Sequence, residues 1–280
     1  LAFMNLIYTN SFSKMKPGSS RYALMLGEDG MVKDDGIICK ISDEHFIATT
    51  TTGGAATVLG CMEEYAQTEW PNLNVYMNSI TEQYATFNIS GPKTRNIIEK
   101  VFPEVNFSNE AFPFMTFQFH EYEDTPIRIL RASFTGEMGY EIYVPSNQAL
   151  KIWEKIISFG KEFGLMPYGT ETMHLLRAEK GYIIVGQDTD GSITPLDLGL
   201  DWMIGKSKKD FLGKRSLIRS DTVRKDRKQL VGILPTNKNE KLEEGQHIIL
   251  DKEIKTPTPM LGHITSCYQS PTLGLSLIHI

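Results

Sequence analysis

Arg131-Ala-Ser-Phe-Thr-Gly-Glu-Met-Gly-Tyr-Glu-Ile-Tyr-Val-Pro145 is the stretch that decides the fold of this chain. Gly136 and Gly139 predict a tight turn, and the aromatic and β-branched run 140–144 predicts a strand directly after it. The turn therefore delivers an acidic side chain, Glu141, on a rigid strand beside a bend. Such an arrangement indicates a ligand clamp.

A second informative stretch is Leu176-Arg-Ala-Glu-Lys-Gly-Tyr-Ile-Ile-Val-Gly-Gln-Asp-Thr-Asp-Gly191. Arg177 and Glu179 lie at the end of an apolar helical pattern, and Gly181 predicts the C-terminal end of that helix. The polar run 186–191 that follows predicts a strand edge.

Composition limits the class of protein. A chain of 280 residues is long enough for one large hydrophobic core or two to three small ones. Its composition, 41% hydrophobic and 22% charged, is typical of a folded protein. A formal net charge of −5 argues against a nucleic-acid surface. The basic run from Lys206 to Arg215 is interpreted as a solvated face, with a phosphate or polyglutamate site as the alternative.

The cysteines and apolar runs indicate the compartment. Cys39, Cys61 and Cys267 lie far apart without a Cys-x-x-Cys spacing, which predicts a reduced, cytoplasmic protein without disulfides or structural zinc. The longest apolar stretches fall well short of the roughly 20 residues of a membrane span.

Hydrophobic periodicity predicts an α+β chain. A meander of antiparallel strands is expected from Tyr22 to Thr52, followed by a helix from Ala55 to Thr68. Further strands are expected at 83–89, 114–122, 126–133 and 140–144, and helices at 93–101, 147–160 and 170–180. Short strands at 229–234, 247–250 and 262–266 predict a small β-barrel.

These motifs carry a family resemblance. The first stretch resembles the Tyr-Thr-Gly-Glu-x-Gly-Phe-Glu signature of the glycine-cleavage aminomethyltransferases (T-proteins), and the second resembles their Leu-Arg-Leu-Glu-Ala-Gly segment. Nearly the whole chain is similar to the C-terminal, folate-binding half of the α subunit of heterotetrameric sarcosine oxidase. The stretches that carry this closer similarity are Gly30-Met-Val-Lys-Asp-Asp-Gly36, Thr68-Glu-Trp-Pro71, Ser108-Asn-Glu-Ala-Phe-Pro-Phe-Met115, Pro167-Tyr-Gly-Thr-Glu-Thr-Met173 and Gly181-Tyr-Ile-Ile-Val-Gly-Gln-Asp-Thr-Asp-Gly191.

The resemblance implies a T-protein-like fold of three sub-domains. We expect residues 1–82 and 161–225 to form a first, discontinuous folate-binding sub-domain, 83–160 a second, and 226–280 an incomplete C-terminal β-barrel. The chain opens without an initiator Met, and residues 276–280 do not follow the family pattern. We therefore expect a piece truncated at both ends.

The resemblance also implies a set of site residues. Asp35 matches the acid beside the reacting nitrogens of tetrahydrofolate, whereas strand alternation turns its neighbour Asp34 the other way. Glu141 matches the acid that holds the pterin ring, whose amidine-like N–H edge suits a carboxylate. Further expected pocket residues are Tyr22, Thr50, Thr51, Phe134 and Arg177. Phe134 stands where T-proteins commonly carry Tyr.

Each of these residues also has an ordinary structural interpretation. Arg177 would otherwise form an ion pair with Glu179 or Glu171 on its own helix. An Asp-Asp pair is commonly a solvated edge, and the threonine run 49–52 is simply β-prone. The histidines lack metal-ligand spacing, and neither a nucleophile elbow nor a Gly-x-Gly-x-x-Gly motif is present, so no metal or dinucleotide site is predicted.

The function implied by the resemblance is one-carbon transfer. The chain is expected to bind tetrahydrofolate and to capture, from an amine-derived imine, the one-carbon unit of oxidised sarcosine as 5,10-methylenetetrahydrofolate. Flavin, NAD and the oxidation itself are expected in other regions or in partner sarcosine oxidase subunits. The alternatives are a freestanding aminomethyltransferase or folate-dependent demethylase, and a non-catalytic folate-binding module. Neither nucleic acid nor membrane is an expected partner.

Overall fold

The computed structural model describes residues 1–238, 240–250 and 256–280. Its contacts divide the chain into two compact units. Unit 1 comprises Leu1, Ser13–Tyr22 and Gly36–Met173, and unit 2 comprises Ala2–Phe12, Ala23–Asp35 and His174–Ile280. The boundaries between the units fall after Leu1 and after Phe12, and within β1 (Ser20–Leu26), β2 (Val32–Lys40) and α5 (Thr170–Lys180). The predicted boundaries of three sub-domains stay a prediction.

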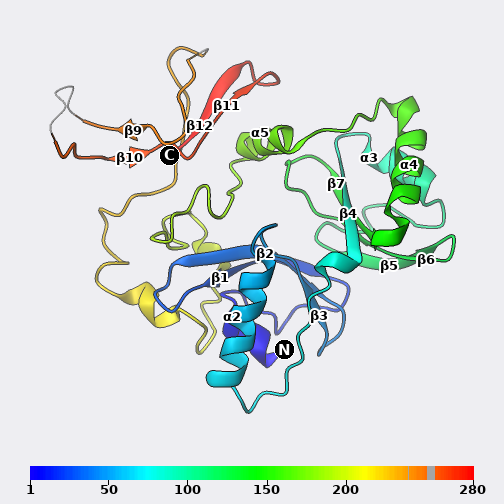
Figure 1. Cartoon of the computed structure of the whole chain (residues 1–280), viewed down its shortest axis with the longest axis horizontal. Coiled ribbons are helices and arrows are strands. Elements are labelled where there is room, and N and C mark those ends of the chain that lie inside the picture. Colours follow the sequence, from blue (N-terminus) through cyan, green and yellow to red (C-terminus); the bar gives the residue numbers. More distant parts are fainter. Residues whose placement is uncertain (239, 251–255) are drawn as a thin grey trace. The chain divides into compact units, whose positions relative to one another are not determined.

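Helices and strands follow the mixed order that the sequence predicts (Figure 1). The α-helices are α1 (Ala2–Ile7), α2 (Ala55–Thr68), α3 (Thr94–Val101), α4 (Ala149–Gly160) and α5 (Thr170–Lys180). The remaining strands are β3 (Phe46–Ala48), β4 (Tyr84–Ser90), β5 (Phe117–Tyr122), β6 (Thr125–Leu130), β7 (Gly139–Pro145), β8 (Gly232–Ile233), β9 (His247–Ile248), β10 (Gly262–His263), β11 (Ser266–Ser270) and β12 (Leu275–His279). β1, β2 and β3 form a three-stranded sheet in that order.

The main sheet of unit 1 has the antiparallel order β4-β7-β6-β5. Side chains alternate across its two faces. Ile129, Tyr140 and Ile142 belong to the larger apolar core, together with residues of α3 and α4. In Figure 1 these two helices lie against this sheet. Glu141 and Tyr143 consequently project from the opposite face.

The turn before β7 has the glycine geometry that the sequence predicts. Gly136 has a φ of 77°, which favours glycine because other residues rarely adopt it. A Cβ on Gly139 would lie 2.7 Å from the carbonyl oxygen of Ala132, so a side chain there would displace the backbone. These two positions place β7, and with it Glu141, directly after the bend.

The C-terminal part of unit 2 contains two small antiparallel sheets. The first pairs β10 with β9, and the second has the order β11-β12-β8. Among the described residues these strands do not close into a barrel. The sequence patterns did not predict β12.

The prediction of a strand edge at 186–191 is wrong. The segment forms turns, because Gly186 and Gly191 have φ angles of 92° and 82°, which an extended strand does not accommodate. The side chain of Asp188 also accepts the backbone N–H of Ile184 at 2.9 Å, and this bond closes the local loop.

No helix in the described part of the chain is both long and apolar enough to cross a membrane.

Candidate functional site

The centre of β7 presents Glu141 beside a tyrosine hydroxyl. Glu141 is half-buried and lies opposite Leu130 of β6 and Asn88 of β4. Tyr143 follows two residues later on the same side of the strand, and its hydroxyl donates a hydrogen bond to Oε2 of Glu141. The carboxylate is therefore held by a neighbour on its own strand.

The electrostatic surroundings of Glu141 act in opposite directions. Burial raises the pKa of its carboxyl, whereas the Tyr143 hydrogen bond and the positive charge of Arg128 favour ionisation; the net shift is upward. Nearby Cys39 lies in the small apolar cluster that includes Tyr143. Burial raises the pKa of its thiol to about 12, so Cys39 is neutral at physiological pH.

Polar groups from β4 and the segment before α5 extend this face of the sheet. Oδ1 of Asn88 accepts a hydrogen bond from the Tyr168 hydroxyl at 3.0 Å and another from Ser90. Asn88 is the cross-strand neighbour of Glu141. The face thus gathers a carboxylate, an amide and a phenol that could bind a polar, hydrogen-bonding ligand.

The other residues predicted for the site in unit 1 lie on separate elements. Tyr22 is half-buried on β1, and Phe134 is half-buried in the turn before β7. Thr50 and Thr51 follow β3, where the Thr50 hydroxyl donates to the carbonyl of Thr51 at 2.9 Å. Their role in a ligand pocket stays a prediction.

The two neighbouring aspartates lie on β2, as predicted. Asp34 is 5% exposed, whereas Asp35 is half-buried. Strand alternation directs the two side chains to opposite sides. Which carboxylate faces a ligand stays a prediction, as does a common cavity with Glu141.

Arg177 forms an ion pair, but with a different partner from the one that its ordinary structural interpretation gives. Its side chain is completely enclosed and pairs with Asp188 at 2.6 Å, rather than with Glu179 or Glu171 on its own helix. The same guanidinium donates to Ser266 Oγ at 2.6 Å and to the carbonyl of Tyr182 at 3.0 Å. Arg177 therefore ties α5 to β11 inside unit 2, and its predicted contact with folate stays a prediction.

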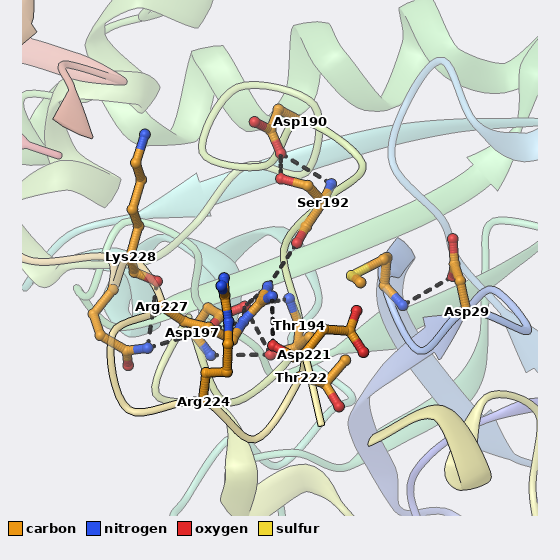
Figure 2. Close-up of polar contacts among 12 residues, drawn as sticks. Asp29, Asp190, Ser192, Thr194, Asp197, Asp221, Thr222, Arg224, Arg227 and Lys228 are labelled. Carbon is orange, nitrogen blue, oxygen red and sulfur yellow. Dashed lines mark hydrogen bonds and ion pairs between the residues drawn. The ribbon is translucent and has the colours of Figure 1, made fainter. Parts of the chain in front are cut away.

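A second polar cluster in unit 2 surrounds Asp197 (Figure 2). Arg227 contacts both carboxylate oxygens, with a shortest distance of 2.6 Å, and Thr194 donates through its backbone N–H and its hydroxyl at 2.8 Å each. Burial opposes ionisation, but these bonds outweigh it and lower the pKa of Asp197. Gln229 also donates to this carboxylate. The hydrogen bonds to the Asp197 carboxylate all come from residues within the cluster. This indicates a structural role, which the sequence patterns did not reveal.

No group of three or more His, Cys, Asp and Glu side chains in the described ranges has the arrangement of a metal site.

Comparisons with known proteins identify the family. The model of the GCVT N-terminal domain matches residues 1–208. An aminomethyltransferase of Thermoanaerobacter pseudethanolicus (strain ATCC 33223 / 39E) is 31% identical over 290 residues, which cover 99% of this chain and 72% of that protein. The chain therefore belongs to the GCVT family, which includes the aminomethyltransferases.

The resemblance to sarcosine oxidase α subunits is also confirmed. The sarcosine oxidase subunit alpha of Corynebacterium sp. (strain P-1) is 50% identical over 275 residues, or 97% of this chain. The corresponding subunit of Rhizobium meliloti (strain 1021) is 38% identical over 277 residues, or 98% of this chain. The chain spans 28% of the length of each of these relatives.

A solved structure confirms the T-protein-like fold. The crystal structure of the glycine cleavage system aminomethyltransferase T from Bartonella henselae matches with a TM-score of 0.81 at 22% identity. The match covers 99% of this chain and 72% of that one.

Proposed function

We propose that the chain binds tetrahydrofolate at the face of unit 1 that presents Glu141. The observation that carries this proposal is the state of the Glu141 carboxylate. Oε2 is anchored by Tyr143, while Oε1 has no hydrogen bond among the described residues. A pterin ring offers an edge of N–H donors, for which a half-buried carboxylate on a rigid strand is a suitable acceptor. Membership of the GCVT family supports this ligand class.

The finer proposal is that the chain is the folate-binding part of a sarcosine oxidase α subunit. The 50% identity to a subunit of that name supports it. Bound tetrahydrofolate would supply the two nitrogens that capture the one-carbon unit of the imine as 5,10-methylenetetrahydrofolate, and the amine of the imine would leave as glycine. This chain would orient the folate near the amine-derived imine, a proximity effect worth several kcal/mol, and Asp35 would accept a proton during the transfer. Amine oxidation is assigned to other parts of the complete enzyme.

A freestanding aminomethyltransferase is the second candidate, because the chain covers 72% of a relative with that name. The two candidates differ in the donor of the one-carbon unit. Sarcosine-dependent formation of 5,10-methylenetetrahydrofolate by the complete enzyme supports the first, and folate-dependent transfer without sarcosine oxidation supports the second.

Glu141→Gln is expected to weaken tetrahydrofolate binding by about 1–3 kcal/mol, because the ligand's N–H donors lose a charged acceptor. Isothermal titration calorimetry at pH 7.5 measures the change. The matched control is Glu137→Gln, which removes an exposed carboxylate four residues earlier and should leave the affinity unchanged. Equal affinities for Glu141→Gln and the unmodified chain would remove the basis of the proposed site.

Asp35→Asn is expected to slow formation of 5,10-methylenetetrahydrofolate in the complete enzyme by about a hundredfold or more, because a proton acceptor is lost. Sarcosine oxidation should continue at its usual rate. Asp34→Asn is the paired variant, and its rate, expressed per folded protein, should stay close to that of the unmodified enzyme. If Asp34→Asn is the slower of the two, the wrong carboxylate has been assigned.

A further inference from the structure

Arg128 of β6 is a buried cation with an unusual set of contacts. Its side chain is 4% exposed, yet none of the ion pairs among the described residues includes it. Its Nε is buried without a hydrogen-bond partner in the same part of the chain. Taking a guanidinium out of water costs several kcal/mol. A residue that merely filled space at this position would not need to carry a charge.

The shorter of the two cation–π contacts of Arg128 is with the ring of Tyr143. The two residues lie directly opposite each other in the β6–β7 ladder. The Cζ of Arg128 lies 3.9 Å from the centroid of the Tyr143 ring, within the range of a cation–π interaction. The hydroxyl of the same tyrosine donates to Glu141. The Arg128 cation therefore contacts the Tyr143 ring, and the Tyr143 hydroxyl contacts the Glu141 carboxylate. We call these linked contacts across β6 and β7 the Arg128–Tyr143–Glu141 series.

This series has a chemical consequence for the carboxylate. A cation on the face of a phenol draws electron density from it, which strengthens the phenol O–H as a hydrogen-bond donor. That donor engages Oε2 of Glu141 and favours its charged form. Oε1 is left without a hydrogen bond among the described residues.

We propose that Tyr143 and Arg128 are positioning residues, which hold the Glu141 carboxylate ionised and in one orientation for the N–H edge of the ligand. The inference rests on the proposed function of Glu141. Tyr143 acts directly on the carboxylate, and Arg128 acts both through the tyrosine ring and through its own charge.

The charges around Glu141 agree with this assignment. Burial raises the pKa of Glu141, and the Tyr143 hydrogen bond and the Arg128 charge are the two effects that oppose the rise. The thiol of Cys39 on β2 is neutral because burial raises its pKa to about 12, and the facing residue of β4 is the uncharged Asn88. Folate affinity should be lost as the pH falls through the raised pKa of Glu141, since a protonated carboxyl is a poorer acceptor. Loss of either positioning residue should move that decline to higher pH.

The test compares Tyr143→Phe and Arg128→Met with the matched control Tyr84→Phe. Tyr84 also faces Arg128, with its ring centroid 5.9 Å from Cζ, but its hydroxyl makes no hydrogen bond among the described residues. Two quantities are measured on the 280-residue chain between pH 5.5 and 9. The first is the pKa of Glu141 without folate, by ¹³C NMR of labelled glutamate assigned through Glu141→Gln. The second is tetrahydrofolate affinity.

Tyr143→Phe and Arg128→Met are expected to raise the pKa of Glu141 and to reduce folate affinity about tenfold at pH 6, with recovery toward pH 9. Tyr84→Phe should change neither quantity. An unchanged pKa of Glu141 in folded Tyr143→Phe would overturn the inference, whatever happens to folate. If Arg128→Met fails to fold, Arg128→Lys replaces it, because lysine retains a cation. Arg128→Lys should raise the pKa of Glu141 less than Tyr143→Phe does. A larger rise in Arg128→Lys would contradict the inference that Arg128 acts through Tyr143.

The two measurements separate the inference from the proposed function. Suppose that Tyr143→Phe raises the pKa of Glu141 but Glu141→Gln binds folate normally. Tyr143 then acts on the Glu141 carboxylate, but Glu141 does not hold the folate. That result overturns the inference that these residues position Glu141 for folate. If Glu141→Gln weakens folate binding while Tyr143→Phe leaves the pH profile unchanged, the site stands and the positioning role is refuted.

Discussion

Asp188→Asn is expected to lower the free energy of unfolding of unit 2 by about 3–5 kcal/mol, because it leaves the enclosed guanidinium of Arg177 without its counter-charge. The carboxylate also accepts hydrogen bonds from Ile184 N–H and from the Thr265 hydroxyl at 2.6 Å. Asparagine keeps the shape of the side chain but not its charge. Urea denaturation followed by circular dichroism measures the loss.

The matched control is Asp190→Asn, two residues along the same segment. Asp190 is exposed, and its hydrogen-bond partners are the hydroxyl and backbone N–H of Ser192 (Figure 2), so we expect a change below about 1 kcal/mol. In the double variant Arg177→Met, Asp188→Asn, the loss should be smaller than the sum of the two single losses, because no buried charge remains unpaired. Additive losses would show that the two residues do not act as a pair.

Tyr140→Ala is expected to destabilise unit 1 by about 3–5 kcal/mol, because it empties the centre of an aromatic cluster. Tyr140 is completely buried, and its ring meets those of Phe107 and Phe112 edge-on, with centroid distances of 5.4 and 5.7 Å. Such contacts add to the free energy of burial. Thermal and urea unfolding of the variant measure the loss.

Tyr140→Phe, in contrast to Tyr140→Ala, is expected to keep or raise the stability of unit 1. The hydroxyl of Tyr140 is buried without a hydrogen-bond partner among the described residues, so its removal takes away a desolvation penalty and leaves the ring in place. We expect a free energy of unfolding equal to or up to about 2 kcal/mol above that of the unmodified chain. A clear loss of stability in Tyr140→Phe would mean that the hydroxyl has a partner in solution, such as a bound water.

Much of the fold could be predicted from local sequence patterns. The expected helices at 55–68 and 170–180 match α2 and α5, and the expected strand at 140–144 lies within β7. The turn before β7 was predictable because glycine alone suits the backbone at Gly136 and the close approach at Gly139. Gly181, with a φ of 75°, likewise ends α5 as its residue type predicts.

The predicted position of Glu141 on a strand after a bend was correct, but most of its surroundings were not visible in the sequence. Tyr143 could have been found from strand alternation alone, because it lies two residues from Glu141 on the same face. Arg128 could not, since its position opposite Tyr143 depends on the register of β6 against β7. A shift of one residue would have turned Arg128 to the other face.

By itself, the sequence determined most of the helices and strands outside the C-terminal part of unit 2, the glycine turn and the family to which the chain belongs. These features follow from residue types and from spacings of two and about 3.6 residues, which are local. Only the tertiary structure decided that Arg177 pairs with Asp188, that Asp197 pairs with Arg227, and that Arg128 lies over Tyr143. Each of these contacts joins charges or rings from separate segments, and burial selects among the many partners that the sequence alone allows, because an unpaired charge inside the protein is costly.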